Sequence, residues 1–133
     1  MNILVYSTSR NEIGERLRKS IEKGVSADNV EFYQTIDSLS QRLHQPMHDL
    51  CVAVLLASTR GELTDILSIR DVLLGIRIVL ILPDSKSDTI SKGHSLAPRF
   101  LTYVDSDFEE VEAVVHKIFI SVCQDQGSEA RMS

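Results

Sequence analysis

The sequence predicts a single α/β domain built on a doubly wound, five-stranded parallel sheet. Its 133 residues fit one domain, and a hydrophobic content of 43% is enough for one core. Five short apolar runs alternate with polar segments, which is typical of β-α repeats. Two of these runs, residues 50–56 and 76–82, are almost wholly apolar, as expected of strands that helices cover on both faces.

The predicted strands are residues 2–6, 30–36, 50–56, 76–82 and 100–104. The second of them alternates between polar and apolar residues, which favours a place at the sheet edge. Because β-α-β crossovers are right-handed, we expect the flavodoxin-like strand order 2-1-3-4-5.

The predicted helices lie between the strands. Ser9 with Glu12, and Thr59 with Glu62, have capping-box spacing, and Gly75 is expected to end the helix that Thr59 starts. Asp37 or Ser38 is expected to cap the second helix. The fourth helix, within residues 85–96, is the weakest because it contains Gly93. The last helix carries a broad apolar stripe: Phe108, Val111, Val114, Val115, Ile118, Phe119 and Val122.

Charge and cysteine usage narrow the class of protein. A net charge of −5 without a basic cluster argues against nucleic acid or an anionic membrane as partner. The start resembles no signal peptide, and Cys51 and Cys123 form no metal or CxxC spacing, so a reduced cytoplasmic setting is expected. We expect one domain over residues 1–123 and a frayed polar tail over 124–133.

The segments that follow the strands are where a site is expected, because ligands of such sheets bind beyond the carboxyl ends of the strands. They comprise residues 7–11, 57–60, 83–86 and 105–107. Asp84, Asp105 and Asp107 lie there, and we interpret them as turn residues rather than as an acidic patch. His44 and His48 are separated by a proline, so no metal pair is expected from them.

A family resemblance appears in the third and fifth strands. Residues 49–54 (DLCVAV) are similar to the third-strand segment of bacterial response-regulator receiver domains. Residues 96–104 and 108–111 look like the end of their fourth helix, their fifth strand and the start of their fifth helix. The resemblance implies a signalling role in a two-component system with a kinase or an output protein as partner.

The same resemblance implies that the phosphorylation site is missing. Receivers carry an acidic pair after strand one, an acceptor aspartate at the end of strand three and a lysine at the end of strand five. The matching residues here are Ser7 and Thr8, Val54, and Tyr103, while the hydroxyl position after strand four falls near Pro83. Valine cannot act as the carboxylate nucleophile, and two hydroxyls are poor ligands for Mg²⁺.

We therefore interpret the chain as a pseudo-receiver: a non-enzymatic interaction domain without a cofactor or metal. No aspartate or glutamate lies between Leu50 and Arg60, so a shifted alignment does not restore an acceptor. By the resemblance, a protein partner or a second copy of the chain would bind the face of the fourth and fifth helices and the fifth strand. The residues expected on that face are Ser91, Lys92, Arg99, Tyr103 and Phe119.

The loop after the first strand leaves a second hypothesis open. Ser7, Thr8, Ser9, Arg10 and Asn11 loosely resemble the hydroxyl-rich phosphate loop of flavodoxins, so the chain could bind a phosphate-bearing ligand such as flavin mononucleotide. The simpler interpretation is that Ser9 caps the first helix. The loop also lacks the glycine that lets a backbone approach a phosphate closely.

Overall fold

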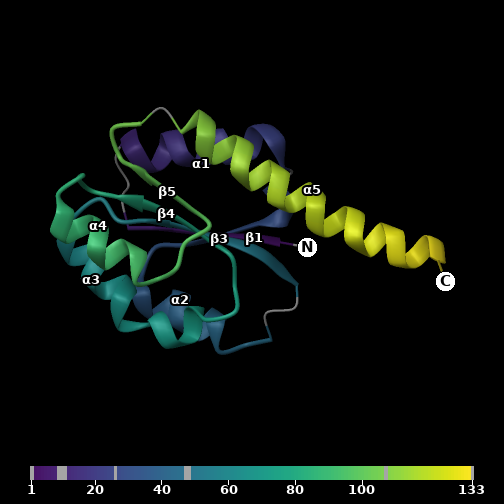
Figure 1. The fold of residues 1–133 in the computed structure, drawn as a ribbon, viewed down its shortest axis with the longest axis horizontal. Helices are drawn as coiled ribbons and strands as arrows, with labels where there is room; N and C mark the ends of the chain where they lie inside the picture. The colour runs from purple at the N-terminus through teal and green to yellow at the C-terminus, as the bar shows by residue number, and fades with distance from the viewer. Residues whose placement is uncertain (1, 9–11, 26, 47–48, 107, 133) are drawn as a thin grey trace.

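The computed structural model contains a five-stranded, all-parallel sheet in the order β2-β1-β3-β4-β5, which confirms the predicted fold class and strand order (Figure 1). It describes residues 2–8, 12–25, 27–46, 49–106 and 108–132, and for residues 27 and 122–132 only the backbone. The strands are β1 (Asn2–Ser7), β2 (Val30–Tyr33), β3 (Leu50–Leu56), β4 (Ile78–Leu82) and β5 (Phe100–Tyr103).

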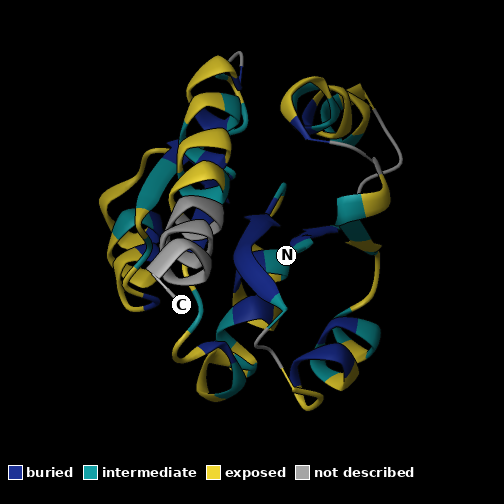
Figure 2. Ribbon diagram, turned by 90° about the vertical axis from the view of Figure 1, so that its right-hand side faces the viewer, coloured by how far each residue is buried: buried dark blue, intermediate teal, exposed yellow. Residues whose placement is uncertain are grey.

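Helices cover both faces of the sheet, so two apolar clusters form its core (Figures 1 and 2). One face carries α1 (Glu12–Gly24) and α5 (Glu109–Met132), and the other carries α2 (Ile36–Leu43), α3 (Arg60–Ser68) and α4 (Ser87–His94). We call these the α1/α5 face and the α2–α4 face. Short 3₁₀ turns, η1 (Ala27–Asn29) and η2 (Arg70–Leu73), precede β2 and β4. Every residue of β3 and β4 is buried, which explains their apolar runs.

The second helix begins earlier than expected. Thr35 caps α2, and its hydroxyl oxygen accepts a hydrogen bond from the backbone N–H of Ser38 at 3.1 Å. Asp37 and Ser38, the predicted caps, lie inside the helix. β2 is an edge strand as predicted but ends at Tyr33, so Ile36 belongs to the helix and packs on the core of the α2–α4 face.

The third helix has the predicted start and an earlier end. Thr59 and Glu62 form both hydrogen bonds of a capping box. The helix ends at Ser68, and the chain tightens into η2 before Gly75, which takes the left-handed φ of 89°. Gly75 thus ends the helical segment as a whole, whereas we expected an uninterrupted helix up to it.

Gly93 of α4 is required by packing. A Cβ built there would lie 3.2 Å from side-chain carbons of Leu80, Leu82 and Leu101, so glycine lets the helix approach β4 and β5 closely. Glycine lowers the intrinsic helix propensity of this segment, but its lack of a side chain lets α4 pack closely on the sheet.

We expect Gly93→Val to destabilise the protein by about 2 kcal/mol, because an overpacked core forces side chains and backbone apart. Gly61→Val is the matched control, since among the described residues beyond its own helix backbone and chain neighbours a Cβ there would meet only the Thr59 hydroxyl oxygen, at 3.7 Å. Urea unfolding followed by circular dichroism measures both variants. Equal stabilities of the two variants would contradict the close approach of α4.

The apolar stripe of α5 is only partly buried. Phe108, Val111 and Val115 are fully buried against the α1/α5 face of the sheet, while Ile118 and Phe119 are half-buried at its margin. The α5 backbone is helical to Met132, beyond the end that we expected near residue 123.

A polar network joins α2 to the start of the sheet. Arg42, 8% exposed, donates from Nε to Glu31 at 2.8 Å and from a terminal nitrogen to Asp49 at 3.0 Å. Asn2 and Tyr33 also donate to the Glu31 carboxylate, at 2.9 and 2.8 Å. The network ties β1, β2, α2 and the start of β3 together at the edge of the sheet opposite the carboxyl ends of the strands.

Candidate functional site

The carboxyl ends of the strands meet at one edge of the sheet, as the parallel topology requires. Ser7 at the end of β1 lies beside Leu56 at the end of β3, and Leu82 at the end of β4 lies beside Tyr103 at the end of β5. Ligands of open α/β sheets bind beyond the carboxyl ends of the strands, and we therefore treat this edge as the candidate site.

Val54, which the resemblance matched to the acceptor position, lies two residues before the end of β3. It pairs with Val5 of β1 and Val79 of β4 in the interior of the sheet, with no exposed surface. The end of β3 is Leu56, which is 1% exposed, followed by fully buried Ala57. Neither Leu56 nor Ala57 carries a carboxylate, so this position offers no nucleophile for a phosphoryl group.

Glu62 is the carboxylate nearest to the end of β3 along the chain, and one of its oxygens caps the start of α3. Its Oε2 accepts hydrogen bonds from the Ser58 backbone at 2.6 Å, the Ser58 hydroxyl at 2.5 Å and the Thr59 backbone at 3.1 Å. The sequence predicted the Thr59 contact but gave no signal for the Ser58 contacts.

Burial, with smaller contributions from Glu62 and Asp65, raises the pKa of Tyr6 to about 12, so this phenol stays protonated.

Asp84 joins the loops after β3 and β4. It accepts from Arg60 Nε at 3.3 Å and from the Lys86 backbone at 3.0 Å. The nearby Thr89 hydroxyl, then Lys86 and Arg60, lower the pKa of Asp84, so the carboxyl is ionised at neutral pH. Thr89 Oγ1 itself does not reach hydrogen-bond geometry in the structure, so we regard it as a weak polar contact.

A shallow hollow of about 390 Å³ lies between the ends of β4 and β5. Its lining residues are Pro83, Asp84, Ser85, Tyr103 and Asp105. Within the described part of the chain, no three histidine, cysteine, aspartate or glutamate side chains come together as metal ligands do. Asp107 lies outside the described residues.

The loop proposed to hold a phosphate is described only in part. Ser7 and Thr8 are half-buried, whereas Ser9, Arg10 and Asn11 lie outside the described residues. Ser7 lines a hollow of about 70 Å³ between α1 and β2. That volume is small beside the 300 Å³ or more that is usual for a bound ligand.

The predicted interaction residues lie on β5, just before it, and on the helices at either side of it. Tyr103 packs on the core of the α2–α4 face, and Phe119 packs on the core of the α1/α5 face, with edge strand β5 between them. Ser91 and Lys92 are exposed on α4, where Lys92 pairs with Asp88 at 3.7 Å. Arg99 is exposed just before β5.

The structure also bears on the histidines His44 and His48 and on membrane-spanning helices. His44 directs Nδ1 at the Ser40 carbonyl oxygen at 2.7 Å, a contact within α2 and its end, while His48 lies outside the described residues. None of the described helices is both long and apolar enough to cross a bilayer.

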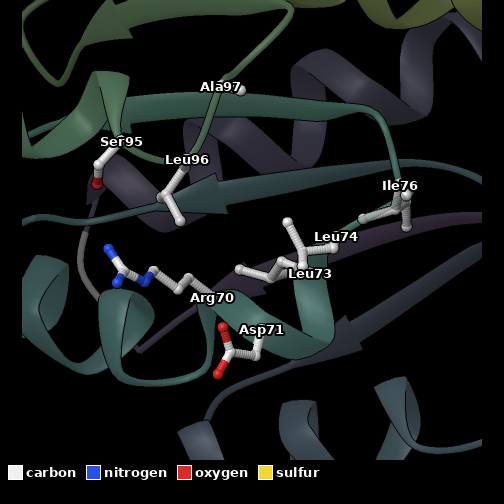
Figure 3. Close-up of a pocket in the computed structure, with 9 residues that line it drawn as sticks. Arg70, Asp71, Leu73, Leu74, Ile76, Ser95, Leu96 and Ala97 are labelled. Atoms are coloured by element: carbon white, nitrogen blue, oxygen red, sulfur yellow. The ribbon is translucent and has the colours of Figure 1, made fainter.

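An apolar hollow of about 320 Å³ opens at the other edge of the sheet, between the segment before β4 and the end of α4 (Figure 3). Leu73 and Leu96 are buried beside it, whereas Leu74 is 72% exposed. It lies away from the carboxyl ends of the strands and was not predicted from the sequence.

Comparison with known proteins gives a structural answer only. No protein-family profile matches the sequence, and no curated protein matches it either. Among solved structures, a protein of Burkholderia pseudomallei K96243 provisionally assigned to pilus assembly superposes with a TM-score of 0.64. It is 16% identical, and the match covers 89% of this chain and 88% of that one. The chain has a flavodoxin-like fold.

Two further structures agree with that fold. A pilus assembly protein (CpaE) of Burkholderia thailandensis E264, also a provisional assignment, gives a TM-score of 0.64 at 15% identity over 89% of this chain and 97% of that one. A designed Rossmann 2x3 protein gives 0.58 at 16% identity over 90% of each chain. At these identities the similarity establishes the fold and leaves activity open.

Proposed function

We propose that this chain is a receiver-like protein-interaction domain that works without phosphorylation and has no enzymatic activity. The observation that carries the proposal is the end of β3, where buried Leu56 and Ala57 stand in place of a nucleophilic carboxylate. The neighbouring carboxylates of Glu62 and Asp84 are held by helix-capping and ion-pair contacts.

The partner in this proposal is a protein, either an output protein, a kinase or a second copy of the chain. Two structural neighbours are provisionally assigned to pilus assembly, and a role of that kind is compatible with this proposal. The exposed Arg60–Asp84 pair links the loops after β3 and β4 at the end of the sheet where a receiver would bind phosphate.

We expect incubation with Mg²⁺ and acetyl phosphate to leave the mass of the protein unchanged. No described side chain at the end of β3 offers a carboxylate for acyl-phosphate formation. Intact-protein mass spectrometry checks this, with an authentic receiver domain treated in parallel as the positive control. A hydroxylamine-sensitive phosphate adduct on this chain would refute the proposal.

The flavodoxin-like alternative has weaker support, because the hollow beside Ser7 is small and the chain has only 5% aromatic residues to stack on a flavin ring. Flavin binding would make the purified protein yellow, and an absorption spectrum after incubation with flavin mononucleotide tests it.

A further inference from the structure

Three basic side chains surround a hollow of about 230 Å³ between α5 and the starts of β4 and β5. They are Arg77, Arg99 and Lys117, and Ile118 and Ser121 complete the lining. We call this set of five residues the basic hollow. It lies at the sheet edge opposite the candidate site, so no residue of the phosphorylation argument takes part in it.

The three cations are not neutralised by the described part of the chain. Arg18, Arg42, Arg60 and Lys92 each form an ion pair with a carboxylate. Arg77, Arg99 and Lys117 form no ion pair or hydrogen bond through their side chains with any described residue, and all three are exposed. Three positive charges around one hollow are therefore available to attract an anionic group.

The backbone fixes two of these residues before any ligand binds. The carbonyl of Arg77 accepts from the Ala53 N–H at 2.8 Å, and the Arg99 N–H donates to the Ile78 carbonyl at 2.7 Å. Both residues therefore lie directly before their strands, with the backbone held by hydrogen bonds to the neighbouring strand. Binding has to order only the side chains, which lowers its entropic cost.

The size and lining of the basic hollow select the kind of anion. Small-molecule sites usually enclose 300 Å³ or more, so 230 Å³ suits the ends of carboxylate side chains better than a nucleotide. Half-buried Ile118 adds an apolar wall that a peptide can contact. A single hollow with three basic side chains offers no extended basic track of the kind that nucleic acid or an anionic membrane surface contacts.

We propose that the basic hollow binds carboxylate side chains of an acidic segment in a partner protein. This rests on the proposed function, because it names the chemistry of the partner that an interaction domain would take. Arginine and lysine would donate charge-assisted hydrogen bonds to the carboxylates while the peptide backbone passes over Ile118.

The test uses a fluorescein-labelled glutamate-rich peptide and a glutamine-rich peptide of equal length, followed by fluorescence anisotropy. We expect the protein to bind only the acidic peptide, and raised salt to weaken that binding. The variant Arg77→Gln/Arg99→Gln/Lys117→Gln is expected to bind at least about tenfold more weakly, which corresponds to about 1.4 kcal/mol.

The matched control is Lys19→Gln/Lys23→Gln/Arg70→Gln, which removes the same charge from exposed residues elsewhere and should bind within about twofold of wild type. Equal weakening in both triple variants would overturn the proposal, because it would reduce binding to net charge. The proposal would also be overturned if the first variant bound the acidic peptide as tightly as wild type does, if wild type did not bind it, or if wild type bound an oligonucleotide equally well. Displacement of the peptide by millimolar inorganic phosphate would show a free-anion site and overturn the peptide assignment.

The same protein sample is treated with acetyl phosphate, and its mass is measured by intact-protein mass spectrometry before the titration. A phosphate adduct refutes the proposed function whatever the peptide does. An unmodified protein that ignores the acidic peptide refutes only the basic hollow as a docking site.

Discussion

Replacing Val54 with aspartate is expected to destabilise the protein strongly rather than to create a phosphorylation site. Val54 has no exposed surface and lies between Val5 and Val79 in the sheet ladder. A carboxylate placed there loses its hydration without gaining a partner. We expect a loss of about 4 kcal/mol or more, against a total stability of about 5–15 kcal/mol that is usual for a domain.

The pH dependence of this variant identifies the cause. Burial raises the pKa of a carboxyl group, so folded Val54→Asp would hold its proton more tightly than the unfolded chain. Its stability should therefore fall as pH rises above about 3.9, the ordinary value for aspartate. Val54→Ala is the control: it should cost about 2 kcal/mol independently of pH.

Urea unfolding at about pH 5 and about pH 8 measures both variants, across the range over which a buried carboxyl loses its proton. A Val54→Asp protein as stable as wild type, and phosphorylated by acetyl phosphate, would contradict the strand register. It would also restore the interpretation of Val54 as the acceptor position.

The bounds of β3 could be predicted from the sequence because every residue of the strand is buried, which leaves an unbroken apolar run. The register of that strand could not be predicted from the sequence. An apolar run has no internal marker, so shifting residues 49–54 by two positions preserves its resemblance to a receiver strand. The pairing of Ser7 with Leu56 fixes the register, and that pairing exists only in the folded sheet.

The packing of the predicted interaction residues could not be predicted from the sequence. Strand β5 lies at the sheet edge between α4 and α5. Tyr103 of β5 packs on the core of the α2–α4 face, while Phe119 of α5 packs on the core of the α1/α5 face. The basic hollow was missed because Arg77, Arg99 and Lys117 are far apart in the sequence, and no local pattern of charge marks their convergence.

Arg42→Met is expected to lower the free energy of unfolding by about 3 kcal/mol. The substitution keeps most of the apolar stem but leaves the Glu31 carboxylate with Asn2 and Tyr33 as its remaining described donors. Removing one partner of a buried ion pair is costly because the other charge stays partly desolvated. Lys92→Met is the control, since its exposed pair with Asp88 should contribute less than about 0.5 kcal/mol.

The contribution of the Glu31 charge to stability changes with pH in a definite direction. The hydrogen bond from Arg42, and smaller ones from Asn2 and Tyr33, hold the pKa of Glu31 below its ordinary value of 4.5. A depressed carboxyl pKa stabilises the folded protein above that ordinary value, and the stabilisation is lost as pH falls through the folded pKa. Wild type should therefore lose more stability than Arg42→Met on acidification, so the difference between the two proteins shrinks at low pH.

Urea unfolding of wild type and Arg42→Met, at neutral pH and again below the ordinary Glu31 pKa of 4.5, decides between charge and packing as the source of the loss. A difference that narrows in acid assigns it to the Glu31 carboxylate. A difference of the same size at both pH values would assign it to the packing of the Arg42 stem, because aliphatic contacts do not titrate.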